Sequence, residues 1–211
     1  MSDAAPRLHV LAGVNGAGKS SLGGAMIRAA GADYYNPDEA ARALIIANPG
    51  LQQDKANAVA WRQGKRLLEE AVHRRLDFAF ETTLGGATMT RILADAAAAG
   101  FQVRIFYVGL ESADLHVERV RRRVRSGGHD IPEADIRRRW RHSRLNLVSL
   151  LPALTELRLF DNSTDGDPVQ GHVPAPMLVL HLRDGDIVGP RNLTSTPVWA
   201  KPIVAAALKL G

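Results

Sequence analysis

Eight residues near the N-terminus have the types and the spacing of a phosphate-binding loop. Residues 13–20 read GVNGAGKS, which matches the pattern G-x-x-x-x-G-K-[ST]. In such a loop the glycines let successive backbone N–H groups turn towards phosphate oxygens, and the helix that follows favours negative charge at its N-terminus. An apolar run at 8–12 and a helical stretch at 21–30 supply the strand and the helix that the motif requires. We therefore expect the chain to bind a nucleoside triphosphate.

The expected nucleotide site consists of this loop and the residue after it. Its members are Gly13, Asn15, Gly16, Ala17, Gly18, Lys19, Ser20 and Ser21. Lys19 would supply a mobile cation for the β- and γ-phosphates and is therefore also a catalytic candidate. Ser20 is expected to bind Mg²⁺ through its hydroxyl.

A carboxylate follows the second expected strand. Asn36 and Pro37 are typical of a helix start, and Asp38 lies in the first turn of that helix. Ligands of a parallel sheet bind at the carboxyl ends of its strands, so Asp38 is a candidate for the base that accepts the proton of an attacking hydroxyl. The alternative is that Asp38 only complements the dipole of its helix, and the local sequence supports both interpretations equally.

A second carboxylate, Glu81, ends the apolar strand at 77–81 and is followed by the hydroxyls of Thr82 and Thr83. If this strand lies beside the first one, Glu81 is next to the phosphate loop. There it could hold Mg²⁺ through water or orient a substrate. The alternative is an ordinary strand end that meets solvent.

An arginine-rich segment covers about residues 119–146. Ten arginines stand there against three acids, and Gly127 and Gly128 predict a hinge between two helices. Such a segment could close over the triphosphate as a lid and neutralise charge in the transition state. The alternatives are a nucleic-acid surface and, for most of these arginines, a solvated helix face. His129 lies in the hinge and is interpreted as structural.

Strands that alternate with helices predict an α/β fold with three layers, in which a mainly parallel five-stranded sheet carries helices on both faces. The five strands are expected at 8–12, 33–35, 77–81, 101–108 and 156–160. Residues 164–211 are expected to form a short β extension with strands at 177–182 and 187–188. The length of 211 residues suits one domain over 1–211.

Composition excludes several classes of protein. The chain has no cysteine, which rules out disulfides and thiolate metal sites. It has no apolar stretch long enough for a membrane span, and its first residues lack the regions of a signal peptide. We therefore expect a cytoplasmic protein that is not bound to membranes.

The chain resembles the zeta-toxin-like P-loop kinases over about residues 7–163. The segments that carry the resemblance are GVNGAGKSS at 13–21, NPD at 36–38, FETTL at 80–84, RVRRRVRSGGHDIPEADIRRRWRHSRLN at 119–146 and DNS at 161–163. The resemblance implies a P-loop kinase that transfers the γ-phosphate of ATP to a hydroxyl. Zeta toxins phosphorylate UDP-N-acetylglucosamine, and an antitoxin protein blocks their nucleotide site.

The resemblance also implies roles for single residues. Lys19 and Ser20 would bind ATP and Mg²⁺, and Asp38 would be the base. The residues that would position substrate are Asp38, Glu81, Thr82, Thr83 and Arg139, with Glu81 also near the metal. The catalytic arginines of the lid would be Arg123 and Arg138.

Two other functions remain as alternatives to a kinase. The first is a switch that binds or hydrolyses ATP without an acceptor, although a switch has no need of a base at Asp38. The second is an enzyme that acts on nucleic acid through the arginine-rich segment. Trp140 is the only aromatic residue among those arginines, whereas single-strand binders usually offer several, so nucleic acid is not an expected partner.

Overall fold

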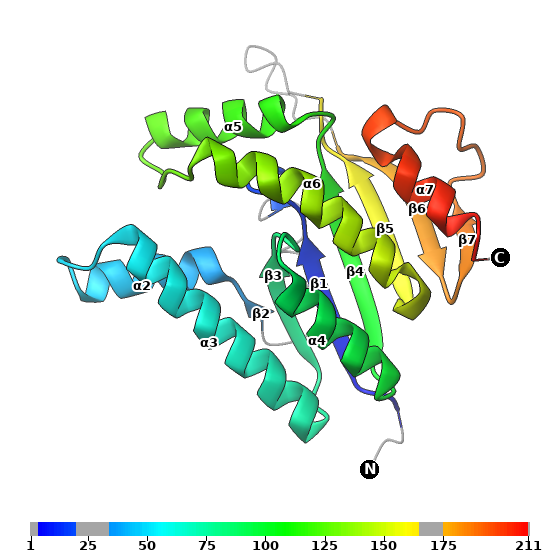
Figure 1. Ribbon diagram of the computed structural model, residues 1–211, viewed down its shortest axis with the longest axis horizontal. Helices are drawn as coiled ribbons and strands as arrows, with labels where there is room; N and C mark the ends of the chain where they lie inside the picture. Colours follow the sequence, from blue (N-terminus) through cyan, green and yellow to red (C-terminus); the bar gives the residue numbers. More distant parts are fainter. Residues whose placement is uncertain (1–3, 20–33, 165–174, 211) are drawn as a thin grey trace.

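A mixed sheet of seven strands is the centre of the computed structural model, which describes residues 4–19, 34–164 and 175–210 (Figure 1). The strands are β1 (Arg7–Ala12), β2 (Tyr34–Tyr35), β3 (Phe78–Thr82), β4 (Gln102–Gly109), β5 (Glu156–Asp161), β6 (Met177–Arg183) and β7 (Asp186–Gly189). Their order across the sheet is β2-β3-β1-β4-β5-β6-β7. The first five pair in parallel, and β6 and β7 add antiparallel strands at the β5 edge. The expected five-stranded sheet is therefore too small by two strands, because the C-terminal extension joins the same sheet.

The described helices from α2 to α6 connect the parallel strands, and α7 follows the last strand. Their bounds are α2 (Pro37–Ala47), α3 (Gln53–Arg74), α4 (Ala87–Ala98), α5 (Ala113–Arg125), α6 (Glu133–Leu150) and α7 (Lys201–Ala207), with short 3₁₀ turns η1 (Leu151–Ala153) and η2 (Val198–Ala200). Asn36 begins α2 as expected, since its side-chain oxygen accepts the backbone N–H groups of Asp38 and Glu39. Helix α7 lies in a region for which only strands were expected.

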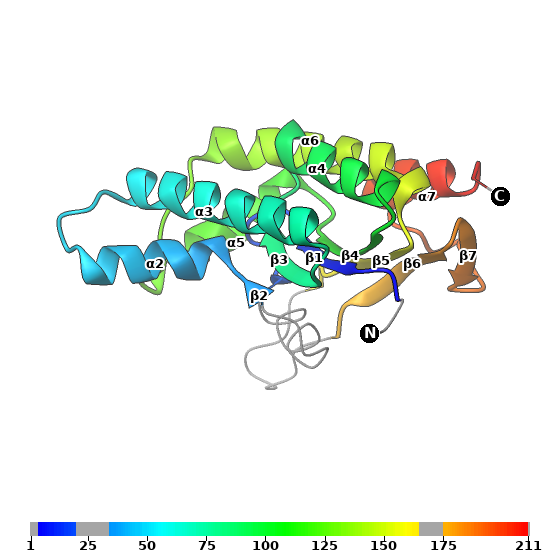
Figure 2. The ribbon, with the colours of Figure 1, turned by 90° about the horizontal axis from the view of Figure 1, so that it is seen from below.

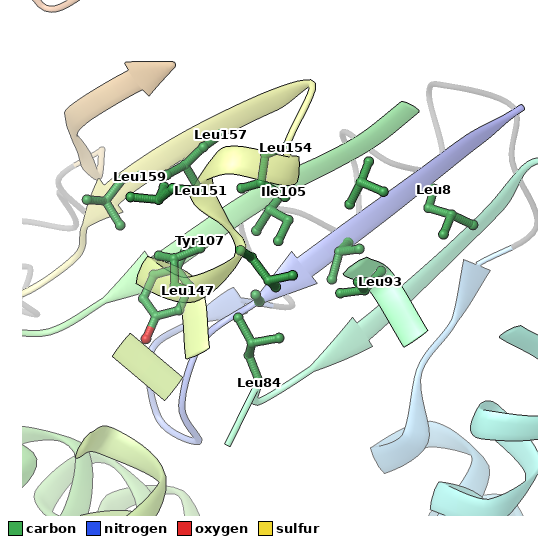
Figure 3. Close-up of a cluster of buried hydrophobic side chains, with 14 of the residues drawn as sticks. Leu8, Leu84, Leu93, Ile105, Tyr107, Leu147, Leu151, Leu154, Leu157 and Leu159 are labelled. Carbon is green, nitrogen blue, oxygen red and sulfur yellow. The ribbon is translucent and has the colours of Figure 1, made fainter. Parts of the chain in front are cut away.

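The main core lies between the sheet and four of the helices. Figure 2 shows α3, α4, α6 and α7 along one face of the sheet. Alternate residues of β1 and β4, among them Leu8 and Ile105, point into this layer, as strand geometry requires (Figure 3). Tyr107 is also buried there, where its hydroxyl is 2.9 Å from that of Ser143 on α6.

A smaller core cluster lies on the opposite face of the sheet. It includes Leu11, Ala79 and Val108, and Leu115 of α5 packs against it. The described helices thus contact both faces of the sheet. In the part of the chain that the structure describes, we find no helix that is both long and apolar enough to cross a membrane.

The strand order brings together the segments that carry the predicted site. Strand β1 lies between β3 and β4, and Leu11 is in register with Glu81. Strand β2 pairs with β3, which places Asn36 and the start of α2 next to the end of β3. The carboxyl ends of β1, β2 and β3 therefore meet at one edge, near α2 and α5 in Figure 1.

Candidate functional site

A cleft of about 500 Å³ opens at this edge of the sheet. Its walls come from the phosphate loop, the start of α2, one side of α3, the end of β3 and the start of α6. The predicted site residues that line it are Asn15, Lys19, Asp38, Glu81, Thr82, Thr83 and Arg139. The structure thus brings the phosphate-loop lysine and both candidate carboxylates into one cavity.

The phosphate loop has the backbone that its glycines permit. Gly13 and Gly18 adopt φ angles of +141° and +85°, which side chains disfavour. A Cβ atom on Gly13 would collide with the carbonyl oxygen of Val108. A Cβ atom on Gly18 would lie 2.6 Å from the amide nitrogen of Asn162, which donates a hydrogen bond of 2.9 Å to the Ala17 carbonyl. The end of β5 therefore closes against the loop and leaves room only for glycine.

Lys19 and Glu81 form a buried ion pair. The Lys19 ammonium lies 3.2 Å from one Glu81 oxygen, and the two side chains are 6% and 7% exposed. The other Glu81 oxygen accepts hydrogen bonds from the Tyr34 hydroxyl at 2.9 Å and from the Asn36 amide at 3.2 Å. Glu81 is thus held in place from β2 and the start of α2, beside the lysine that the motif directs to phosphate.

Asp38 lines the cleft from the first turn of α2. Its backbone N–H is bonded to Asn36 at 2.9 Å, but within the described residues its carboxylate makes no hydrogen bond or ion pair. A carboxylate in that state can accept a proton from a bound hydroxyl. Its position in the first turn is also the one that the helix-dipole interpretation requires, so the role as base stays a prediction.

The three lid arginines of the sequence analysis have different surroundings. Arg139 lines the cleft, and its guanidinium donates a hydrogen bond of 2.8 Å to the Asn15 side-chain oxygen in the phosphate loop. Burial lowers the pKa of this guanidinium from its ordinary value, and Asp135 opposes that effect. Arg138 is 57% exposed, pairs with Asp135 at 2.8 Å and is not part of the cleft lining. Helix α6 therefore directs Arg139, rather than the neighbouring arginine, towards the phosphate loop.

The third arginine, Arg123, lies at the hinge between α5 and α6. Its guanidinium donates a hydrogen bond of 3.1 Å to the His129 carbonyl and is not part of the cleft lining. His129 does line the cleft. Burial is the main cause that lowers the pKa of His129, while the charge of Asp38 acts in the opposite direction. Arg123 thus contributes to the structure of the hinge. The other predicted site residues, Ser20 and Ser21, lie outside the described residues.

A buried histidine supports the phosphate loop from behind. His116 of α5 is 1% exposed, and its Nδ1–H donates a hydrogen bond of 2.8 Å to the Asn15 carbonyl. Burial lowers the pKa of His116 to about 4. No pattern in the sequence pointed to this residue, since its role depends on a contact with a residue 101 positions away.

Comparison with known proteins agrees with this architecture. Residues 8–143 match a family model described as an AAA domain. An uncharacterised protein of Haemophilus influenzae is 30% identical over 132 residues, which are 61% of this chain and 88% of that protein.

Two solved structures show the same fold over nearly the whole chain. A chain of the PezAT chromosomal toxin–antitoxin system of Streptococcus pneumoniae has a TM-score of 0.57 at 13% identity, over 100% of this chain and 87% of its own. A chain of the AvrRxo1-ORF1:-ORF2 complex with ATP has a TM-score of 0.66 at 15% identity, over 97% of this chain. This chain spans only 64% of that one. At these identities the likeness concerns the fold.

Proposed function

The chain belongs to the AAA domain family, and from this premise we propose that it is an ATP-dependent kinase for a hydroxyl group of a small molecule. One observation carries the proposal, namely that Lys19 of the phosphate loop and the carboxylate of Asp38 line the same cleft. A switch that only binds or hydrolyses ATP needs Lys19, whereas a phosphotransferase needs both Lys19 and a base such as Asp38. The fold shared with a chain of the AvrRxo1-ORF1:-ORF2 complex, which was solved with ATP, supports ATP as the donor.

The proposed reaction follows from the placement of these groups. Asp38 accepts the proton of the acceptor hydroxyl, and the hydroxyl oxygen forms a bond to the γ-phosphorus. The bond between the γ-phosphorus and the β–γ bridging oxygen breaks, and ADP leaves with that oxygen. Lys19 and Arg139 stabilise the negative charge that spreads over the transferred group. Thr82 and Thr83 lie at the end of β3, where their hydroxyls can orient the acceptor.

Magnesium would lower the charge of the β- and γ-phosphates. The described residues contain no group of three or more His, Asp or Glu side chains that could hold a metal ion alone. That fits Mg²⁺ in phosphoryl transfer, which takes one or two protein oxygens and completes its shell with phosphates and water. Ser20 remains the proposed direct ligand. Glu81 already binds Lys19, Tyr34 and Asn36, so its proposed contact with the metal runs through water.

The comparison with solved structures also supports a protein partner, and the family resemblance suggests an acceptor. A chain of a toxin–antitoxin system shares the fold, which supports the proposal that an antitoxin protein binds this chain. UDP-N-acetylglucosamine is the acceptor that the zeta-toxin resemblance suggests for a first assay. An ATP-dependent switch and an enzyme acting on nucleic acid are the outcomes that would replace a kinase.

Transfer of labelled phosphate tests the proposal. The protein is incubated with Mg²⁺, ATP labelled at the γ-position and a panel of hydroxyl compounds that includes sugars, amino alcohols and nucleotide sugars. We expect label in one acceptor class, and we expect Asp38→Asn to abolish it while ATP still binds. Release of labelled phosphate to water alone, at an equal rate in both proteins, would contradict the kinase and favour the switch.

A further inference from the structure

One lobe of the cleft, here called the α3 lobe, is separate from the phosphate loop. We define it by Tyr35, Asp54, Asn57, Trp61 and Met89, all of which line the cavity. Asp54, Asn57 and Trp61 are spaced by three and four residues on α3, so they lie on one side of that helix. Figure 1 shows α3 beside α2, the helix that carries Asp38 in its first turn. The lobe is therefore where the part of an acceptor remote from the reacting hydroxyl would lie.

An indole forms the most prominent apolar surface of the α3 lobe. Trp61 is 43% exposed although it is among the largest apolar side chains of the protein. Tyr35 is held against the same helix, because its hydroxyl donates a hydrogen bond of 2.6 Å to the Ala60 carbonyl. Its ring also packs on α3 where a Cβ atom at Gly64 would lie 2.6 Å away. An exposed indole that lines a cavity offers its face to a planar or a cationic group.

The charged side chains that line the cleft indicate whether a planar or a cationic group fits the lobe. The lining contains five carboxylates, from Asp38, Asp54, Glu81, Asp130 and Asp135, and two permanent cations, from Lys19 and Arg139. Both cations already have acidic neighbours on the phosphate-loop side, at 3.2 and 4.0 Å. Among the described residues no basic side chain lines the α3 lobe, and Asp54 has no ion-pair partner there. The lobe therefore attracts positive charge and repels anions.

We propose that the acceptor is a hydroxyl compound that carries an ammonium group, bound against the face of Trp61 and paired with Asp54. This inference rests on the proposed kinase function and specifies the class of its substrate. Asn57 contributes a neutral contact: its side-chain oxygen accepts the Gln53 amide at 2.9 Å, which leaves its own N–H groups for an oxygen of the acceptor. A sugar nucleotide would bring its negatively charged diphosphate towards the Asp54 carboxylate, so the lobe disfavours that acceptor.

Three matched sugars separate the charge classes. Glucosamine is a cation at neutral pH, N-acetylglucosamine is neutral and UDP-N-acetylglucosamine is an anion, and all three offer sugar hydroxyls. Choline and its neutral isostere 3,3-dimethylbutanol form a second matched pair. Binding is measured by calorimetry in the presence of a non-hydrolysable ATP analogue and Mg²⁺, and transfer is measured with labelled ATP. We expect each cation to exceed its neutral counterpart by about tenfold in affinity and in kcat/KM.

Two substitutions test whether the preference for cations comes from the α3 lobe. In Asp54→Asn the advantage of the cation should fall to about twofold or less, and in Trp61→Ala it should fall in the same direction, since each loses one of the two attractions. Asp95→Asn is the matched control, because Asp95 is an exposed carboxylate on α4 that is not part of the cleft lining. It should keep the full preference.

Different experimental results would contradict the ammonium acceptor and the kinase function. Tighter binding and faster transfer with the neutral or anionic compounds, or an unchanged preference in Asp54→Asn, would overturn the ammonium proposal and leave a kinase in place. Binding of neither cation would overturn it as well. Binding of a cation with the expected dependence on Asp54, but without transfer to any compound, would support the lobe and contradict the kinase.

Discussion

The ammonium group of Lys19 lies 3.2 Å from a carboxylate oxygen of Glu81, and both side chains are buried. The lysine that the phosphate-loop motif assigns to the nucleotide is thus paired with a carboxylate of β3. We expect ATP to exchange one anion for another around Lys19, while Tyr34 and Asn36 continue to hold Glu81. The hydrogen bonds from these two residues keep the carboxylate satisfied during that exchange.

Replacement of Lys19 tests this arrangement. Lys19→Ala removes the cation and leaves the Glu81 charge buried, so we expect loss of ATP binding together with a loss of about 3–5 kcal/mol of stability. The double variant Lys19→Ala with Glu81→Gln should recover most of the stability without recovering ATP binding. Calorimetric ATP titration and chemical denaturation measure the two effects separately. Near-normal ATP affinity in Lys19→Ala would contradict the P-loop assignment.

Asp38→Asn tests the base. The substitution keeps the size and hydrogen-bonding capacity of the side chain but removes its ability to take a proton. We expect ATP affinity to remain and phosphoryl transfer to fall by about 10²–10⁴-fold. Single-turnover transfer beside ATP titration is the measurement. If transfer stays near normal, Asp38 serves only the start of α2, where a charge contributes to helix stability.

Arg139 and Arg138 form a matched pair of neighbouring arginines. Arg139 contacts the phosphate loop through Asn15, whereas Arg138 is exposed and pairs with Asp135. We expect Arg139→Ala to slow transfer much more than it weakens ATP binding, with about 10³–10⁵-fold as the range for an arginine that stabilises the transition state. Arg138→Ala should have a much smaller effect. The resemblance to zeta-toxin-like kinases implied Arg138 or Arg139 as a lid arginine, so a larger loss of transfer in Arg138→Ala than in Arg139→Ala would favour Arg138.

Arg123→Ala completes the set, since Arg123 holds the hinge through His129. A lid that closes during catalysis predicts slower transfer in this variant with little change in ATP affinity. Gel-shift assays with DNA and RNA at physiological salt check the alternative use of the same arginines. Binding there should be weak, without sequence preference, and should fall steeply as salt rises. Tight, salt-resistant binding with normal transfer in all three variants would favour the nucleic-acid enzyme.

The depressed pKa of His116 predicts a loss of stability in acid. Its pKa is about 4 in the folded protein and near 6.5 in the unfolded chain. Between these values the unfolded state binds a proton that the folded state refuses, so stability falls as pH falls from about 6.5 to about 4. The full effect is about 3 kcal/mol at 1.36 kcal/mol per pKa unit. Denaturation curves at several pH values should show a flatter dependence in His116→Asn, which keeps a donor for the Asn15 carbonyl.

His73→Asn is the control for this experiment, because His73 is exposed on α3. It should leave the pH dependence unchanged. If His116→Asn and the wild-type protein lose stability in parallel between pH 6.5 and 4, carboxylates cause the acid sensitivity and His116 does not.

Local sequence was sufficient for the parts of the site that follow strands. The phosphate loop, Asp38 and Glu81 each come directly after a strand or end one, and parallel strands gather such positions at one edge. Residues whose roles depend on contacts far along the chain could not be found in this way. His116 contacts Asn15 across 101 positions, and Trp61 has a candidate role only because α3 borders the cleft.

Two further features could not be predicted from the sequence: which side of a helix faces the site, and whether the late strands join the main sheet. Arg138 and Arg139 are adjacent in sequence, and only the packing of α6 decides which one faces the phosphate loop. The strands β6 and β7 were expected as an extension, but sequence pattern does not say whether late strands join the main sheet. Helix α7 is too short for a clear apolar period, and the core it covers forms only in the folded sheet.

The central place of β1 has a consequence for how the chain folds as it leaves the ribosome. Strand β1 ends at Ala12, but its neighbours in the sheet begin at Phe78 and Gln102. The strand that carries the phosphate loop therefore has no partner on either side until the ribosome has made much of the chain. Such non-local pairing slows folding and leaves apolar segments open to aggregation meanwhile. A nascent chain stalled before β4 would lack the strand that pairs with β1 and packs against Gly13 of the phosphate loop, so we expect C-terminal truncations that remove β4 to abolish ATP binding.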